Sequence, residues 1–335
     1  MHALAQRAGS FAVDHAHGQD AALPALGKVV GQQFGDLVRT KRVQVQIAGD
    51  WNLDGLFIEW FGIVSHRRIG GGTMIRIALA AIVFAVAAYS AEPVKIKFTG
   101  SPGPYTVERW RADWRGCEWE DGVKEGHVSL TQRESKNWLR VDYAVGEIGP
   151  EKCGAGWRYP IGKHETAELR YTVRFGKDFD WVKGGKLPGL SGGPDNVSGG
   201  RPATGTNGFS ARLMWRTDGR GEAYVYHKNQ SDNYGDRFSF PDDFHFPTDT
   251  PVQVRIRVSM NEVGKRNGKL YVWIRAGESS PEQLLVSRTS MEWRSVATFG
   301  VDSVYFETFH GGSDKTWAPT KPCWAEFGGF SVRDD

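Results

Sequence analysis

Short runs in which apolar and polar residues alternate recur from about residue 94 to the end of the chain. Clusters of Gly, Pro, Asn and Asp separate these runs, a combination typical of β-strands joined by turns. The pattern contains no long amphipathic helix and no alternation of strands with helices, which disfavours a parallel sheet. We therefore predict an all-β chain, folded as a two-sheet antiparallel sandwich or jelly roll. Strands are expected over residues 94–98, 105–111, 127–131, 138–143, 168–175, 252–258, 270–274, 301–309 and 327–332.

Residues 209–228 predict an antiparallel hairpin with one apolar and one polar face. Apolar and polar residues alternate in both halves, and an Asp-Gly pair between them is a strong hairpin signal. A turn symmetric about that pair would place Arg212 opposite Tyr226. Met214 would then lie opposite Tyr224. One sheet face is thus expected to carry Ser210, Arg212, Tyr224 and Tyr226.

Glycines surround a single lysine in the segment 181–193, WVKGGKLPGLSGG. Gly184 and Gly185 give backbone freedom before Lys186, while Pro188 and the later glycines disfavour a regular element after it. We therefore expect Lys186 on a shaped turn near the hairpin. From spacing alone, the polar residues of both segments also fit an ordinary solvated sheet face with an arginine–tyrosine stack.

Four motifs in order resemble one group of enzymes: GGKLPGLSGG, SARLMWR, YVY and the late segment FETFHGGSD through WAP. This set resembles the polysaccharide lyase family that includes viral alginate lyases and the related glucuronan lyases. The resemblance implies a β-jelly roll whose concave sheet forms the groove for a uronic-acid polymer. It also implies active-site roles for Lys186, Ser210, Arg212, Tyr224 and Tyr226. The late segment departs from the family pattern at His310, where an aromatic residue is expected.

These residues have the chemistry that β-elimination at a uronic acid requires. The C5 proton becomes acidic only when the adjacent carboxylate is neutralised, and the planar fork of Arg212 can bind a carboxylate through two hydrogen bonds. A base with a pKa near the working pH must then reach C5, and either Tyr226 or Lys186 could serve. Tyr224 would stack on the sugar or share the proton transfer, and Ser210 would position the substrate.

Two later strands offer further candidates for substrate binding. In 252–258 the valines and Ile256 are expected to face inward, which leaves Arg255 and Arg257 outward,. The strand 269–275 similarly presents Tyr271 and Trp273, whose flat faces suit sugar rings,. The alternative is again a solvated sheet face. Among the histidines, His310 in its glycine-rich setting is the best candidate for a place at the groove.

Two other functional classes share the predicted fold. A non-catalytic carbohydrate-binding module would use the same aromatics, but binding alone requires neither Lys186 nor a pair of tyrosines. A glycoside hydrolase would need two carboxylates about 5 to 10 Å apart, and Glu222 and Glu307 are the candidates,. We therefore predict a lyase that cleaves 4-linked uronic-acid polymers such as glucuronan or alginate.

The amino-terminal region predicts export. A positive start at Met74-Ile75-Arg76, an apolar run over 77–88 and small residues before Glu92 have the order of a secretory signal,. The apolar run is too short to span a bilayer, so a secreted or periplasmic protein without a stable membrane anchor is expected. A twin-arginine signal at Arg67-Arg68 is the less favoured alternative,. The predicted parts are 1–73 as an upstream reading-frame extension or disordered leader, 74–91 as the signal peptide and 92–335 as the jelly-roll lyase domain.

The net charge and the motifs of the sequence limit the classes of partner and cofactor that this protein is expected to bind. A formal charge of +3 and the lack of a lysine-rich run interleaved with aromatics disfavour nucleic-acid binding, whereas an acidic polysaccharide needs only local positive charge,. No phosphate loop, dinucleotide fingerprint or zinc spacing is present, so no cofactor is expected, and a structural Ca²⁺ is not predicted. We expect a monomer.

Three cysteines follow the predicted signal peptide. Because an exported protein meets oxidising conditions, a disulfide between Cys117 and Cys153 is expected, with Cys323 left over. The alternative is three free thiols.

Overall fold

The computed structural model describes residues 39–43, 58–69, 73–81 and 93–334, and the chain divides into two units, Met1–Tyr89 and Ser90–Asp335. In the first unit, β1 (Arg39–Val43), β2 (Ile58–Ile69) and β3 (Thr73–Ala81) form an antiparallel sheet in that order. The start of the predicted signal peptide falls in β3 and its remainder lies outside the described residues, so the signal and the extension stay predictions.

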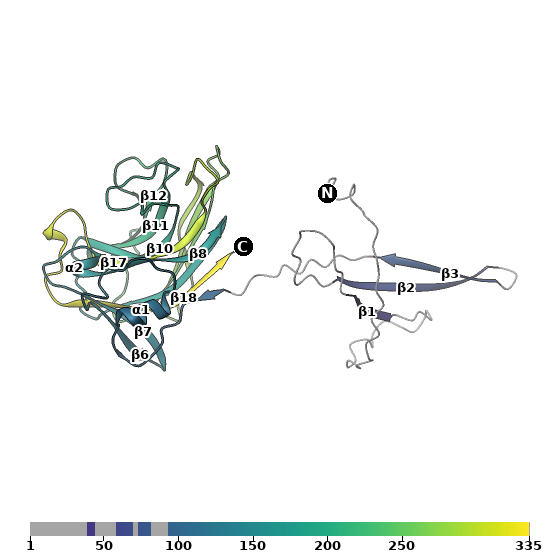
Figure 1. Cartoon of the computed structure of the whole chain (residues 1–335), viewed down its shortest axis with the longest axis horizontal. Helices are drawn as coiled ribbons and strands as arrows, with labels where there is room; N and C mark the ends of the chain where they lie inside the picture. The colour runs from purple at the N-terminus through teal and green to yellow at the C-terminus, as the bar shows by residue number, and fades with distance from the viewer. Residues whose placement is uncertain (1–38, 44–57, 70–72, 82–92, 335) are drawn as a thin grey trace. The chain divides into compact units, whose positions relative to one another are not determined.

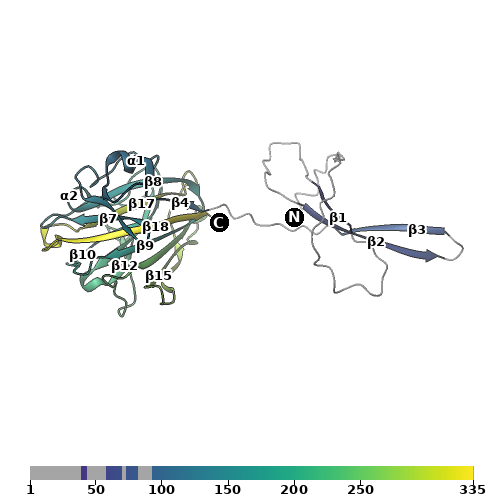
Figure 2. The same ribbon diagram turned by 90° about the horizontal axis from the view of Figure 1, so that it is seen from below.

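The second unit is a sandwich of two antiparallel sheets, which confirms the predicted fold class (Figure 1). One sheet has the strand order β13 (Asp236–Ser239), β12 (Gly221–Tyr226), β11 (Phe209–Arg216), β10 (Gly184–Gly192), β17 (Val301–His310) and β8 (Gly154–His164). The other has β16 (Gln283–Met291), β15 (Gly268–Ala276), β14 (Val252–Ser259), β9 (Thr166–Phe175), β18 (Cys323–Asp334), β7 (Lys136–Tyr143), β6 (Val128–Arg133) and β5 (Gly103–Pro104), with β4 (Val94–Lys95) also paired to β18. Figure 2 shows β7, β18 and β9 side by side in this second sheet.

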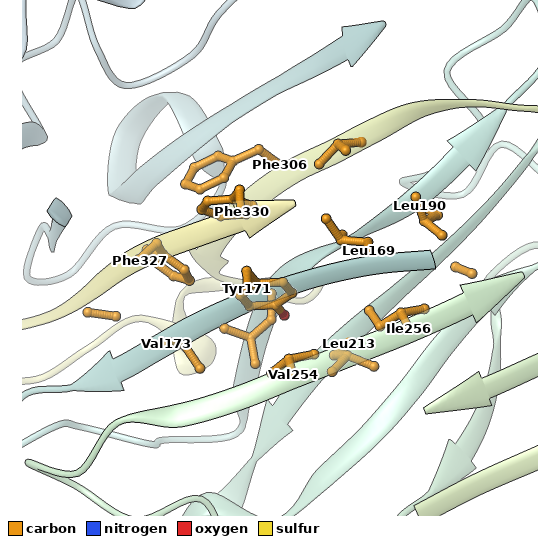
Figure 3. Packing of buried hydrophobic residues seen from close by; sticks show 14 of the residues in the cluster. Leu169, Tyr171, Val173, Leu190, Leu213, Val254, Ile256, Phe306, Phe327 and Phe330 are labelled. Atoms are coloured by element: carbon orange, nitrogen blue, oxygen red, sulfur yellow. The ribbon is translucent and has the colours of Figure 1, made fainter. Parts of the chain in front are cut away.

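The core lies between the two sheets and is built from alternate residues of their strands (Figure 3). Leu169, Tyr171 and Val173 of β9 are buried, and they face apolar residues of the other sheet such as Leu213 of β11. Because successive side chains of a strand point to opposite faces, the residues between these core positions point away from the sandwich interior. The alternation therefore decides which side chains of β10, β11, β12 and β17 reach the outer face of the six-stranded sheet.

The expected strand over 105–111 is wrong, because this segment forms the helix α1 (Val107–Asp113). The Thr106 side chain accepts a hydrogen bond from the Arg109 amide and caps the amino end,. Trp110 and Trp114, four residues apart, are both buried, so a helical face meets the core here,. The other helical elements are short: α2 (Pro150–Cys153), η1 (Thr217–Gly219) and η2 (Lys315–Trp317).

Lys186 lies in the central strand β10, not on a turn as expected. The glycines around it permit close packing: a Cβ at Gly185 would lie 2.1 Å from the Trp215 ring, and one at Gly189 would lie 2.0 Å from the Ala211 carbonyl oxygen. A register shift between Leu187 and Leu190 forms an irregularity that accommodates Pro188, which has no amide hydrogen for the ladder,. The same residue types that signal a turn thus mark a crowded, bulged strand.

We expect Gly189→Ala to destabilise the fold by about 1 to 3 kcal/mol, because the new methyl group would collide with the backbone of β11,. Gly156→Ala in β8 of the same sheet is the matched control, since its Cβ would meet side-chain atoms only at 3.4 Å. Denaturant unfolding of the two variants measures the difference. Equal stability of both variants would show that β10 tolerates a wider separation from β11.

The predicted hairpin is confirmed, but its register differs by two residues. Arg212 lies opposite Tyr224, and Met214 lies opposite Glu222. The shift arises because the connection closes around Asp218, which adopts a left-handed conformation at φ 58 inside η1. A shift of two preserves the strand alternation, so the polar residues still share one face.

All three cysteines are free, so the expected disulfide between Cys117 and Cys153 is wrong. Cys117 follows α1, whereas Cys153 ends α2. Burial raises the pKa of the Cys117 thiol to about 12 and that of Cys153 to about 11,. In the part of the chain that the structure describes, no helix is long and apolar enough to cross a membrane.

Candidate active site

The outer face of the six-stranded sheet brings together all five residues that the family resemblance singled out. They come from three adjacent strands, with Lys186 on β10, Ser210 and Arg212 on β11, and Tyr224 and Tyr226 on β12. The apolar residues that alternate with them along these strands, such as Leu213, are in the core. The prediction that Ser210, Arg212, Tyr224 and Tyr226 share one sheet face is therefore confirmed. Their roles in catalysis stay predictions.

Lys186 is the buried lysine at the centre of the cluster. Its Nζ donates to Sδ of Met214 at 2.8 Å and lies 3.6 Å from the centre of the Tyr224 ring. Burial lowers the pKa of Lys186 well below its ordinary value, and the charges of Arg212 and Arg216 lower it further,. This arrangement favours a neutral amine, which can accept a proton.

Arg212 is only 1% exposed and forms an ion pair through Nη1 with Oε2 of Glu307 on β17. Its guanidinium also lies over the ring of Tyr305, 4.5 Å from the ring centre,. Tyr305 and Glu307 are two residues apart on β17, next to β10 in the sheet, so strand alternation places both on the face that carries Lys186,. The cluster therefore has one more carboxylate and one more tyrosine than the sequence analysis assigned to it.

The two predicted tyrosines form a pair, with hydroxyl oxygens 3.5 Å apart. Burial raises the pKa of Tyr224 above its ordinary value, and its hydrogen bond to Tyr226 adds to this effect. Tyr224 therefore keeps its proton at neutral pH. That protonation state suits a proton donor better than a base.

A loop over residues 193–208 covers this face. Ser210 donates a hydrogen bond to the Val197 carbonyl at 2.7 Å, and the hydroxyl of Tyr226 accepts one from the Gly200 amide at 3.2 Å. Val197 and Ala203 pack with Met214, Tyr224 and Tyr226 in a small apolar cluster. Ser210 and Tyr226 consequently have no exposed surface. The sequence does not predict this loop, because its glycine-rich stretch shows no strand or helix periodicity.

Four predicted substrate-binding residues do not join the cluster. Arg255 and Arg257 lie on β14, and Tyr271 and Trp273 lie on β15, both strands of the nine-stranded sheet. Arg255 stacks on Trp273 at 3.7 Å and pairs with carboxylates. These four residues therefore lie in a different sheet from Lys186, and their role in substrate binding stays a prediction. Alternation identifies the outward face of a strand but not the sheet to which the strand belongs.

The prediction that His310 lies at the groove is also wrong, because this residue is fully buried. Along β17, Tyr305 and Glu307 point outward, so His310 points inward with the core residues. Its ring packs against aromatic side chains including Phe179, and Nε2 donates to the Asp180 carbonyl at 2.6 Å. Burial lowers the pKa of His310 to about 4, so it is a neutral core residue.

The two carboxylates considered for glycoside hydrolysis each have a cationic partner. Glu307 pairs with Arg212, and Glu222 pairs with Arg216 at 2.6 Å. A general acid with a raised pKa would require a carboxyl without such a neighbour, so the hydrolase alternative loses its support. Across the described residues, no group of three or more metal-ligating side chains is found.

Comparison with known proteins assigns the family. Residues 131–330 match the family described as Polysaccharide lyase 14. The chain belongs to this family. The match spans both sheets of the sandwich and every residue of the Lys186 cluster, so this polysaccharide lyase 14 domain is an enzyme of the class that the sequence motifs predicted.

Solved structures agree with this assignment. The marine PL-14 alginate lyase from Aplysia kurodai is 26% identical and has a TM-score of 0.64, with 74% of this chain and 100% of that chain covered. Alginate lyase Aly36B is 24% identical, with a TM-score of 0.62 and coverage of 72% and 96%. Alginate lyase vAL-1 from Chlorella virus is 20% identical, with a TM-score of 0.56 and coverage of 71% and 100%. The latter two share the fold. The chain matches no curated protein sequence.

Proposed function

We propose that this polysaccharide lyase cleaves a 4-linked uronic-acid polymer by β-elimination and leaves a 4,5-unsaturated uronate at the new end. The observation that carries the proposal is a buried lysine with a lowered pKa, placed beside an arginine and two tyrosine hydroxyl groups on one sheet face. A sugar-binding module needs no such amine, because holding a lysine neutral in a buried site costs stability without contributing to binding.

The proposed reaction assigns one role to each group. Arg212 binds the uronate carboxylate and stabilises the charge that develops on it when the C5–H bond breaks. Neutral Lys186 takes the C5 proton, the C4–C5 double bond forms, and the bond from C4 to the linking oxygen breaks. Tyr226 or Tyr224 gives its proton to that oxygen. In β-linked mannuronate or glucuronate the proton and the leaving oxygen lie on the same ring face, so neighbouring groups on one sheet can serve both.

Alginate rich in β-mannuronate is the first substrate to test, and glucuronan is the second. The support for alginate is the similarity to the Aplysia kurodai protein, which is an alginate lyase and is covered over its full length. Secretion or export to the periplasm would bring the enzyme to such a polymer, in keeping with the export signal that we propose at residues 74–91.

The test is the ultraviolet absorbance of the conjugated 4,5-unsaturated uronate, followed while the protein is incubated with mannuronate-rich alginate, glucuronan and hyaluronan. We expect absorbance to rise with alginate. A rise with glucuronan alone would keep the β-elimination and replace the substrate. Binding to a polymer without any rise would instead support the non-catalytic module, and no binding to any of them would refute the proposed substrate class.

A further inference from the structure

The ion pair between Arg212 and Glu307 uses only one end of the guanidinium. Nη1 contacts Oε2 of Glu307, and both side chains are buried, at 1% and 8% exposure. The Tyr305 ring covers one face of the guanidinium at 4.5 Å. These two contacts, from the same outward face of β17, restrict both the rotation and the tilt of the guanidinium plane.

The opposite edge of Arg212 has no partner. Its Nε and Nη2 are buried and make no hydrogen bond to any residue that the structure describes. Leaving two charged N–H groups unpaired costs free energy, so an arrangement that keeps them unpaired in the free protein suggests that a ligand completes it. The Nε–Nη2 edge is one of the two places where arginine binds a carboxylate through parallel hydrogen bonds.

A second set of contacts connects the Arg212–Glu307 ion pair to the loop over residues 193–208. The Tyr305 hydroxyl lies 3.3 Å from Oε1 of Glu307 and 2.8 Å from Oδ1 of Asn196. It also lies 3.2 Å from the hydroxyl of Ser198. Glu307 is therefore held from two sides, by Arg212 and by Tyr305, and its own position is well defined.

We propose that Glu307 is a positioning residue that holds the Nη1 end of Arg212 and so leaves the Nε–Nη2 edge for the carboxylate of the uronic acid. The inference rests on the proposed function and extends it, because it assigns carboxylate recognition to a fixed edge of one arginine. Glu307 does not touch the substrate in this arrangement. Its effect on the reaction passes through the orientation of Arg212.

The deciding variant is Glu307→Asp, which keeps the negative charge beside Arg212 but withdraws it by one methylene group. We expect kcat to fall about 100-fold, because a displacement on this scale misaligns the group that stabilises the developing charge. We also expect the variant to lose the wild-type preference for mannuronate oligosaccharides over their carboxyl-reduced, uncharged counterparts, measured by calorimetry. The second readout reports carboxylate recognition and does not require turnover.

Glu222→Asp is the matched control, since Glu222 is also buried, also outward-facing and also paired with an arginine of β11. It should keep the carboxylate preference, while thermal unfolding should show a similar loss of stability in both variants. An unchanged preference in Glu307→Asp, or an equal loss in both variants, would overturn the inference.

A wild-type protein that prefers the charged oligosaccharide but never cleaves it would refute the proposed reaction and leave the role of Glu307 standing. A wild-type protein without that preference would refute both.

Discussion

Replacing Arg212 with lysine should reduce kcat on the uronic-acid polymer by about 100- to 1,000-fold, the range for loss of one donor that stabilises developing negative charge. Lysine keeps the positive charge next to Glu307, so the buried ion pair can persist. It has no planar fork, however, and cannot present two parallel N–H groups to a carboxylate. Steady-state kinetics on the polymer that the absorbance assay identifies, with thermal unfolding in parallel, measures the effect.

Arg216→Lys is the control for this result, because Arg216 lies four residues after Arg212 on the same face of β11 and pairs with Glu222. Its charge contributes to the low pKa of Lys186, and lysine preserves that charge. We expect nearly normal kinetics. If Arg212→Lys and Arg216→Lys are equally active, the bidentate role of Arg212 is refuted.

Lys186→Met should abolish most activity and at the same time stabilise the protein at neutral pH. Loss of a general base typically lowers kcat by about 100- to 10,000-fold. The stability gain follows from the direction of the shift: the folded-state pKa of Lys186 lies below its ordinary value of 10.5, so between these values the unfolded chain binds a proton that the folded chain does not,. The wild type is penalised in that window, and the penalty disappears as the pH rises towards the ordinary value.

Denaturant unfolding at pH 7 and again near pH 10 tests this directly. The variant should have the higher free energy of unfolding at pH 7, and the difference should shrink at the higher pH. Wild-type activity should also rise with pH through the pKa of Lys186, since only the neutral amine accepts the proton. A variant that is inactive and less stable at pH 7 would indicate that Lys186 is a structural cation.

The five residues on β10, β11 and β12 were predictable from the sequence, whereas Tyr305, Glu307 and the covering loop were not. Strand alternation in 209–228 is a local property, so it identified the shared face of Arg212 and Tyr226 even though the turn changed their pairing by two residues. Lys186 was identified by the motif GGKLPGLSGG, which carries part of the family resemblance. The sheet to which a strand belongs depends on long-range pairing, and this is why the sequence does not show that Arg255 lies in a different sheet from Lys186.

Other differences have equally specific causes. Side chains of β17 alternate between the core and the outer face. Counting from the core residue Phe306 would have placed His310, four residues on, inward and Glu307, one residue on, outward. The segment 105–111 was predicted as a strand, although Thr106 is a residue type that commonly caps the amino end of a helix, as it does in α1. Glycines near Lys186 were interpreted as a turn, although the same residues also permit close approach of backbones within a sheet.

The loop over residues 193–208 covers two side chains that the proposed reaction uses. Its backbone is hydrogen-bonded to Ser210 and to Tyr226, so a polysaccharide segment that reaches these side chains must first break those contacts. A substrate that reaches Ser210 or Tyr226 would therefore have to offset the free energy of these loop contacts through its own binding.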